Sequence, residues 1–327
     1  MTKPLTVGAL SAEPGAKTRG SVSVDLGTVT VGIPLTLANG ARPGPRVVIT
    51  AGVHGGEFSG IDAATRLAAL LDPGEVHGQV VVCPVANPPA VYQGRLGVSP
   101  LDGVNINRVF PGDPDGSPTE RLAAWLFANL LDGADAYIDL HSGGIDEVLK
   151  DFVGYRLTGD PELDAKTADM AGALGIEDVI FGLNAEGGNS HAAAARQGIP
   201  AILVETGQLG ERDAETARAL VLGLYGALSG LGVLDTEAQD TTTPREWVWA
   251  AGVTAETTGL WYPAFAVGDD VTDGQVIGHV VDAANGQEHK VHTPATGRIF
   301  YGMRGLTVAP GTELAAIAAP APRDPDH

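Results

Sequence analysis

The sequence predicts an α/β fold in which helices cover a mostly parallel or mixed sheet. Three observations support this class. Between residues 45 and 230, short β-branched runs alternate with longer segments of helical period. The chain has 327 residues, 44% of them hydrophobic, which suffices for a substantial core. A polar stretch over 234–244, with three consecutive threonines and a closing proline, then precedes short alternating segments and Gly-Asp turns. We therefore expect a main domain of residues 1–240 and an all-β domain of residues 241–327.

Four apolar, β-branched runs are the predicted strands of the sheet. They cover residues 46–53, 79–85, 136–140 and 201–204. The first predicted helix covers residues 60–71 and carries its apolar residues on one face: Ile61, Ala64, Leu67, Ala68 and Leu71. A second covers residues 119–131, with Pro118 close to its start. Both are expected to cover the sheet.

Charge and composition exclude several functions. The formal net charge is −20, so the chain repels nucleic-acid phosphates and anionic membrane surfaces. The start of the chain lacks the apolar region of a signal peptide, and no apolar run reaches the roughly 18 residues of a membrane span. The single cysteine, Cys83, lies in an apolar run and is expected to be a buried small hydrophobe. We expect a cytoplasmic enzyme with no nucleic-acid or membrane partner.

The first motif with chemical content follows the strand predicted at 46–53. This strand leads directly into His54-Gly-Gly-Glu57, and the helix of 60–71 follows. Ligands of open α/β sheets bind beyond the carboxyl ends of strands, and the two glycines permit a tight turn that brings His54 and Glu57 together. A histidine and a glutamate at this spacing can bind one metal ion.

Two further strands end in residues that complete such a site. The run 136–140 is followed by His141, and the run 201–204 is followed by Glu205. Two histidines and one glutamate are the ligands of catalytic zinc sites that leave the fourth position to water. A carboxylate at position 205 could take a proton from that water and return it to a leaving amine without binding the metal.

A loop between these elements carries a candidate substrate-binding pair. Asn107 and Arg108 are adjacent within a segment fixed by glycines and prolines, and Arg95 lies shortly upstream. A guanidinium can give two parallel hydrogen bonds to a carboxylate, so the pair suits a substrate that carries one. Two structural alternatives stay open, because Arg108 could form an ion pair and Asn107 could cap a turn.

The motifs in this order resemble a known family. His-x-x-Glu after a strand, Asn-Arg-x-Phe-Pro-Gly, a distant His-Ser-Gly-Gly and Glu-Thr-Gly are similar to the aspartoacylase and succinylglutamate desuccinylase family, which has a zinc carboxypeptidase-like fold. The resemblance covers roughly residues 45–320. The segment 99–108 is similar to the bacterial branch that includes deacetylases of acetylated diaminobutyrate.

The resemblance implies one Zn²⁺ per chain and roles for the residues singled out above. His54, Glu57 and His141 would bind the zinc ion. Glu205 would be the general base and acid, and Asn107 with Arg108 would bind the substrate carboxylate. It also implies an arginine that stabilises the oxyanion, for which Arg95 is the candidate. A tyrosine from the C-terminal region is implied as well, and Tyr262 and Tyr301 are alternatives.

The C-terminal segment resembles a biotinyl or lipoyl carrier barrel, a barrel-sandwich-like fold. Its hairpin over residues 282–287 contains no lysine to carry the modification. We therefore expect a β domain that walls the active site or forms a subunit contact, which leaves a homo-oligomer as a possible state.

The expected reaction is zinc-dependent hydrolysis of the amide bond of an N-acyl amino acid with a free carboxylate. Two alternatives stay open. A metallocarboxypeptidase or small-peptide hydrolase would use the same metal and the same carboxylate-binding pair. A non-catalytic zinc-binding protein would keep the ligands without turnover.

Overall fold

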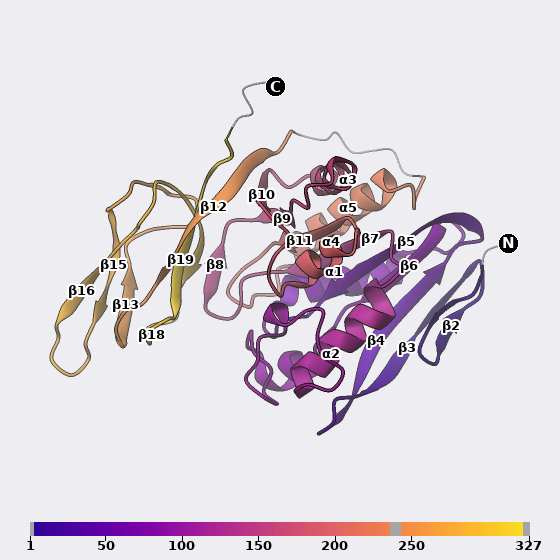
Figure 1. Cartoon of the computed structure of the whole chain (residues 1–327), viewed down its shortest axis with the longest axis horizontal. Helices are drawn as coiled ribbons and strands as arrows, with labels where there is room; N and C mark the ends of the chain where they lie inside the picture. Colours follow the sequence, from indigo (N-terminus) through magenta and orange to yellow (C-terminus); the bar gives the residue numbers. More distant parts are fainter. Residues whose placement is uncertain (1–2, 236–242, 323–327) are drawn as a thin grey trace.

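The centre of the molecule is a 13-stranded mixed sheet, seen in the computed structural model, which describes residues 3–235 and 243–322 (Figure 1). Its twelve consecutive strands, in spatial order, are β14 (Asp270–Val271), β17 (Gly297–Met303), β19 (Glu313–Pro320), β12 (Arg245–Thr254), β10 (Asp178–Gly182), β9 (Phe152–Arg156), β11 (Ala201–Glu205), β7 (Ala136–His141), β5 (Arg42–Ala51), β6 (His77–Cys83), β4 (Thr30–Asn39) and β3 (Ala16–Asp25). Strand β8 (Glu147–Leu149) pairs with β17 beside this path. The predicted α/β class is confirmed.

The four predicted strands are β5, β6, β7 and β11, and they lie together in this sheet. β6, β5, β7 and β11 run parallel to one another, so their carboxyl ends meet at one edge. Most of their residues, and in β5 the second half of the strand, are buried because other elements cover both faces, which explains the continuous apolar runs in the sequence. Cys83 at the end of β6 is buried and unpaired, as expected.

Helices cover both faces of the sheet. Helix α1 (Phe58–Leu70), α3 (Pro161–Gly172) and α5 (Ala214–Gly230) share one core with side chains such as Ile49 and Ile138. Helix α2 (Pro118–Leu126), α4 (Ser190–Arg196) and the hairpin of β1 (Leu5–Val7) and β2 (Leu10–Ala12) share the other core. The neighbouring residues Ile49 and Val48 lie in the first and the second core, respectively. Such alternation is expected of a strand that is buried on both faces.

The two predicted helices are present with small differences at their ends. The helix expected at 60–71 is α1, which begins two residues earlier. The helix expected at 119–131 is α2 followed by one π-helical turn, Phe127–Leu131. Ser117 caps α2 in a capping box with Glu120, which fixes its start.

Two short turns lie between β6 and α2. They are the π-helical turn Ala90–Gly94 and the 3₁₀ turn Ile106–Arg108. Among the described residues, no helix is both long and apolar enough to cross a membrane. The expected cytoplasmic location stays a prediction.

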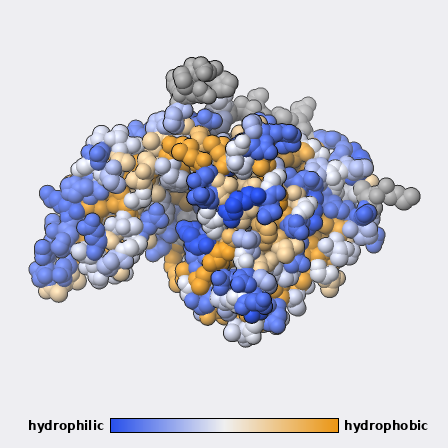
Figure 2. All heavy atoms as spheres, viewed as in Figure 1, coloured by the Kyte–Doolittle hydropathy of each residue, from blue (hydrophilic) through white to orange (hydrophobic). Residues whose placement is uncertain are grey.

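The described residues after 243 form strands, as the alternating pattern predicts. Besides those in the central sheet, they form a four-stranded sheet in the order β16 (Glu288–His292), β15 (Val276–Val281), β13 (Gly259–Pro263) and β18 (Thr307–Val308). The β15–β16 hairpin lies at the far end of the molecule, where Figure 2 shows mostly hydrophilic residues. A separate core around Trp261, Ile277 and Ile299 holds these strands together.

The C-terminal strands continue the central sheet. β12 pairs in parallel with β10 and antiparallel with β19, and Trp247, Phe300 and Phe152 pack across this junction. The proposed boundary near residue 240 stays a prediction, because residues 236–242 of the predicted linker lie outside the described residues.

Candidate active site

A cavity of about 530 Å³ opens beyond the carboxyl ends of the central parallel strands. β5 ends three residues before His54, β7 ends at His141, and β11 ends at Glu205. His141 and Glu205 are paired in register on neighbouring strands. All these side chains line the cavity, together with Glu57 at the start of α1. The structure thus places the four predicted residues in one site.

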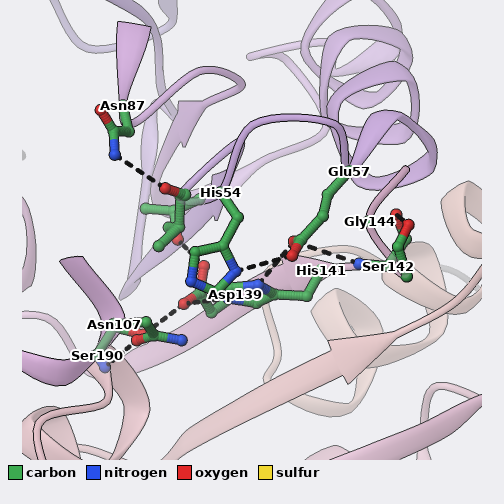
Figure 3. A network of polar contacts seen from close by, with 12 residues as sticks. His54, Glu57, Asn87, Asn107, Asp139, His141, Ser142, Gly144 and Ser190 are labelled. Atoms are coloured by element: carbon green, nitrogen blue, oxygen red, sulfur yellow. Dashed lines mark hydrogen bonds and ion pairs between the residues drawn. The ribbon is translucent and has the colours of Figure 1, made fainter. Parts of the chain in front are cut away.

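His54, Glu57 and His141 converge closely (Figure 3). The Nδ1 atom of His54 lies 2.7 Å from Glu57 Oε1, and the Nδ1 atom of His141 lies 2.8 Å from Glu57 Oε2. One ligand atom from each residue lies within 4.8 Å of the others. Both histidine side chains therefore direct their Nδ1 atoms toward the Glu57 carboxylate.

The opposite ring nitrogens are held by oxygen acceptors. His54 Nε2 lies 3.0 Å from Asn105 Oδ1, and His141 Nε2 lies 3.0 Å from Asp139 Oδ2. Asn105 Oδ1 also accepts a hydrogen bond from the backbone N–H of Asn107, so the oxygen of this amide, and not its nitrogen, faces His54. Each Nε2 therefore carries the proton when the ring is neutral, and each Nδ1 keeps its lone pair for a ligand.

The buried carboxylates of Glu57 and Asp139 favour a positive charge between them. Burial opposes ionisation of Glu57, but His54 and His141 lower the pKa of its carboxyl to about 2. Burial likewise opposes protonation of His141, yet Asp139 and Glu57 raise the pKa of its imidazole well above the usual range. A divalent cation between these groups satisfies the same demand. The donor set, with two imidazole nitrogens and one carboxylate, fits zinc.

Asp139 is a site residue that sequence reasoning did not identify. It is fully buried, and besides His141 it accepts hydrogen bonds from Thr50 Oγ1, at 2.5 Å, and from Ser190 Oγ. It precedes His141 by two residues on β7, and residues at this spacing point to the same face of a strand. The Asp-Leu-His pattern within an apolar run was therefore the available signal.

Glu205 faces the cavity with an uncompensated carboxylate. Its Oε2 atom is buried and has no hydrogen-bond partner among the described residues. Burial, followed by the neighbouring carboxylates of Glu57 and Glu147, raises the pKa of Glu205 well above its usual range, although His141 opposes this shift. A carboxyl group with a raised proton affinity that faces a cavity is a candidate for proton transfer.

The loop that carries Arg95 packs against the His54-Gly-Gly-Glu57 turn. The backbone N–H of Gly55 donates to Leu96 O at 3.0 Å, and a Cβ at Gly55 would lie 2.1 Å from Ala90 O. Arg95 itself has a left-handed backbone, with φ of 56°. Its side chain is exposed, lines the cavity and has no ion-pair partner among the described residues. Its guanidinium is thus available to a bound molecule.

Asn107 and Arg108 line the cavity as well. Asn107 is buried, and its Oδ1 accepts the N–H of Ser190 at 2.8 Å, which ties this loop to the start of α4. Its amide Nδ2 has no hydrogen bond among the described residues. Arg108 is exposed and donates Nη1 to its neighbour's carbonyl oxygen at 2.9 Å, and in the described part of the chain no carboxylate lies within ion-pair distance of it. The alternative of a structural ion pair for Arg108 therefore finds no support.

The C-terminal strands form the opposite wall of the cavity. Tyr301 on β17 lines it and donates its hydroxyl to Glu147 Oε1 at 3.1 Å. Tyr262 does not line the cavity, because it stacks on His279 in the four-stranded sheet. Of the two alternative tyrosines, the structure places Tyr301 at the site. The expected wall from the C-terminal strands is present.

Two further residues that line the cavity, His191 and Arg156, make no side-chain hydrogen bond or ion pair with any residue that the structure describes. His191 on α4 is 5% exposed, and its Nδ1 has no hydrogen bond among the described residues. Burial, and next the charge of Arg156, lowers the pKa of His191 to about 3, so its ring is neutral. Arg156 ends β9. Neither residue was assigned a role from the sequence.

Strand ends that carry a His-Glu-His cluster beside a buried carboxylate define this chain as an α/β enzyme with a candidate metal centre. Residues 43–231 match the succinylglutamate desuccinylase/aspartoacylase catalytic domain. The chain belongs to the succinylglutamate desuccinylase/aspartoacylase family and is a hydrolase of amide bonds in acylated amino acids.

Relatives support the same assignment. The chain is 36% identical over 256 residues to the N-alpha-acetyl-L-2,4-diaminobutyric acid deacetylase of Halomonas elongata, covering 76% of this chain and 74% of the relative. A succinylglutamate desuccinylase/aspartoacylase from Rhodobacter sphaeroides is 28% identical with a TM-score of 0.82, covering 93% and 96% of the two chains. The product-bound ectoine utilization protein of Ruegeria pomeroyi, 24% identical, has the same fold, with a TM-score of 0.86 and coverage of 98% and 100%.

Proposed function

We propose that this protein is a zinc-dependent deacylase that hydrolyses the amide bond of an N-acyl amino acid with a free carboxylate. The observation that carries the proposal is the convergence of His54 Nδ1, His141 Nδ1 and the Glu57 carboxylate beside the unpartnered oxygen of Glu205. His54, Glu57 and His141 would hold one zinc ion per chain. When bound, zinc polarises the amide carbonyl and makes water a stronger acid.

Glu205 would move the proton in this reaction. Its carboxylate takes a proton from the attacking water as the water oxygen bonds to the carbonyl carbon. The carbon–nitrogen bond then breaks, and Glu205 gives the same proton to the leaving nitrogen. The products are a carboxylic acid and a free amino acid. The raised pKa of Glu205 favours this exchange because a carboxylate with a higher proton affinity accepts a proton from water more readily.

The arginines would bind the negative charges of the substrate. Arg95, on its loop beside His54, would stabilise the oxygen of the carbonyl as negative charge develops there. Arg108 and the free Nδ2 of Asn107 would hold the carboxylate. Tyr301 on the far wall would confine the substrate between these two groups.

The Halomonas relative suggests the first substrate to test, N-acetyl-2,4-diaminobutyrate. A panel of acylated amino acids and dipeptides, assayed by release of a free amine, separates a deacylase from a carboxypeptidase or small-peptide hydrolase. We expect turnover of acylated amino acids and little turnover of dipeptides. Zinc saturation without turnover across the panel would favour a non-catalytic protein.

The roles of the metal and of Glu205 are tested together. Elemental analysis of zinc-supplied protein should give close to one zinc per chain. Glu205→Gln should keep that zinc and lose about 10²- to 10⁴-fold in kcat, because the base is removed while the ligands stay. The control is Glu162→Gln, an exposed carboxylate on α3. Absence of zinc from the wild-type protein would refute the proposal.

A further inference from the structure

Arg156 is a cavity arginine without a partner. It lies at the carboxyl end of β9, is half-buried, and makes no side-chain hydrogen bond or ion pair among the described residues. Two arginines on β12 and β17 of the same sheet differ in this respect. Arg245 forms two hydrogen bonds to Asp178, and Arg298 forms two to Asp270. The Arg156 guanidinium is therefore free for a molecule that enters the cavity.

The neighbouring strand leaves room for this side chain. Gly182 on β10 pairs in register with Arg156. A Cβ at Gly182 would lie 2.3 Å from Arg156 Nη1 and 2.6 Å from its Cδ, so with any other residue here the arginine would have to move. The guanidinium thus lies across the glycine at the cavity wall, and both residues line the cavity. The absence of a side chain at position 182 allows this position of the arginine.

The charges around Arg156 favour an anion. Burial, and next the charge of Arg108, lowers the pKa of Arg156, and no carboxylate within residues 3–235 and 243–322 forms an ion pair with it. Two cations thus share one part of the cavity in a chain where acidic residues outnumber basic ones 40 to 20. His191, neutral and with an unpartnered buried Nδ1, lines the same region. Across the cavity, Glu313 feels the charge of Arg108 but forms no ion pair with it.

We propose that Arg156 is a second carboxylate-binding arginine of this enzyme, which together with Arg108 selects substrates by their free carboxylate. This inference rests on the proposed function. Arg108 already uses Nη1 for the Asn107 carbonyl, and its remaining fork can occupy only about two of the roughly four lone-pair sites of a carboxylate. A second planar guanidinium supplies donors for the remaining lone pairs, and the bound anion offsets the repulsion between the two arginines.

The test uses one acylated amino acid and its carboxamide, which differ only in the carboxylate. In the zinc-loaded wild-type protein, kcat/KM should be higher for the carboxylate. Arg156→Met should raise KM for the carboxylate about 10- to 100-fold with little change in kcat, because a charge-assisted hydrogen-bonded pair is lost. The carboxamide should change little. Arg156→Lys should restore part of the preference, since it returns the charge without the planar fork.

The control is Arg218→Met, an exposed arginine on α5 outside the cavity. It should leave both substrates unchanged. Melting temperature and zinc content of each variant show whether it folds and keeps the metal centre. If Arg156→Met and Arg156→Lys reduce kcat/KM equally for carboxylate and carboxamide, Arg156 is only structural and the inference is wrong. If the wild-type protein hydrolyses no acylated amino acid, the proposed function fails instead.

Discussion

Replacement of Asp139 by asparagine isolates the contribution of one buried carboxylate to metal binding. Asp139 holds the Nε2 side of His141 at 3.0 Å and accepts from Thr50 and Ser190 on its remaining lone pairs. In Asp139→Asn, the amide oxygen can stay with His141 and Ser190. The amide nitrogen can then face Thr50, whose hydroxyl can turn to accept. The fold should therefore survive the change.

The loss should appear in zinc affinity. Without the negative charge, His141 is a weaker base and its ring is held by a neutral acceptor. Carboxylates in this position typically contribute 10- to 100-fold to metal affinity, which corresponds to about 1.4 to 2.7 kcal/mol. We expect the zinc dissociation constant of Asp139→Asn to rise by that factor, while the melting temperature of the metal-free protein falls by only a few degrees.

Competition with a chelating zinc indicator measures this affinity. Asp178→Asn is a matched control, because Asp178 is equally buried but binds Arg245, Lys150 and Trp247 away from the cluster. It should lower stability by about 1 to 2 kcal/mol and leave zinc affinity unchanged. Equal zinc affinity in Asp139→Asn and wild type would refute the orienting role of Asp139. So would an equal loss of zinc affinity in both variants.

Two further predictions concern buried titratable side chains. Burial raises the pKa of Cys83 to about 12, so the folded protein should not react with a thiol reagent at about pH 8, whereas the denatured chain should react with one equivalent. The pKa of His191 is lowered to about 3. Below about pH 6.5 the unfolded chain therefore binds a proton that the folded chain does not, so the free energy of unfolding decreases as the pH falls. Between about pH 6.5 and 5, denaturant unfolding should show the zinc-loaded wild type losing about 2 kcal/mol more than His191→Gln; parallel losses would contradict a neutral, buried ring.

The central part of the fold could be predicted because its strands are buried on both faces. β5 and β7 read as unbroken apolar runs, and the residues directly after such runs lie at the carboxyl edge. β3 was not predicted. Its exposed face carries charged and polar side chains, and at the edge of the sheet it needs no continuous apolar run. The parallel pairing of β12 with β10 joins distant segments and leaves no local signal.

The residues of the site likewise divide into those that could be predicted from the sequence and those that could not. His54 and His141 follow apolar strands directly, so their meeting could be inferred from the sequence. Arg156 ends a five-residue strand interrupted by Gly154, which lacks a clear period. The choice between Tyr262 and Tyr301 depended on how the C-terminal strands fold back over the cavity, which only pairing between distant strands decides.

The continuous sheet gives the cavity two walls with different freedom to change. The proposed metal and proton chemistry lies at the ends of β5, β7 and β11 and at the start of α1. Tyr301 comes from β17 among the C-terminal strands, and Arg156 ends β9, between β11 and β10. Substitutions on the second wall can reshape the space for the amino acid without displacing His54, His141 or Glu205. We therefore expect that changes at Tyr301 and on β9 alter the substrate preference of this chain while the proposed hydrolytic residues stay in place.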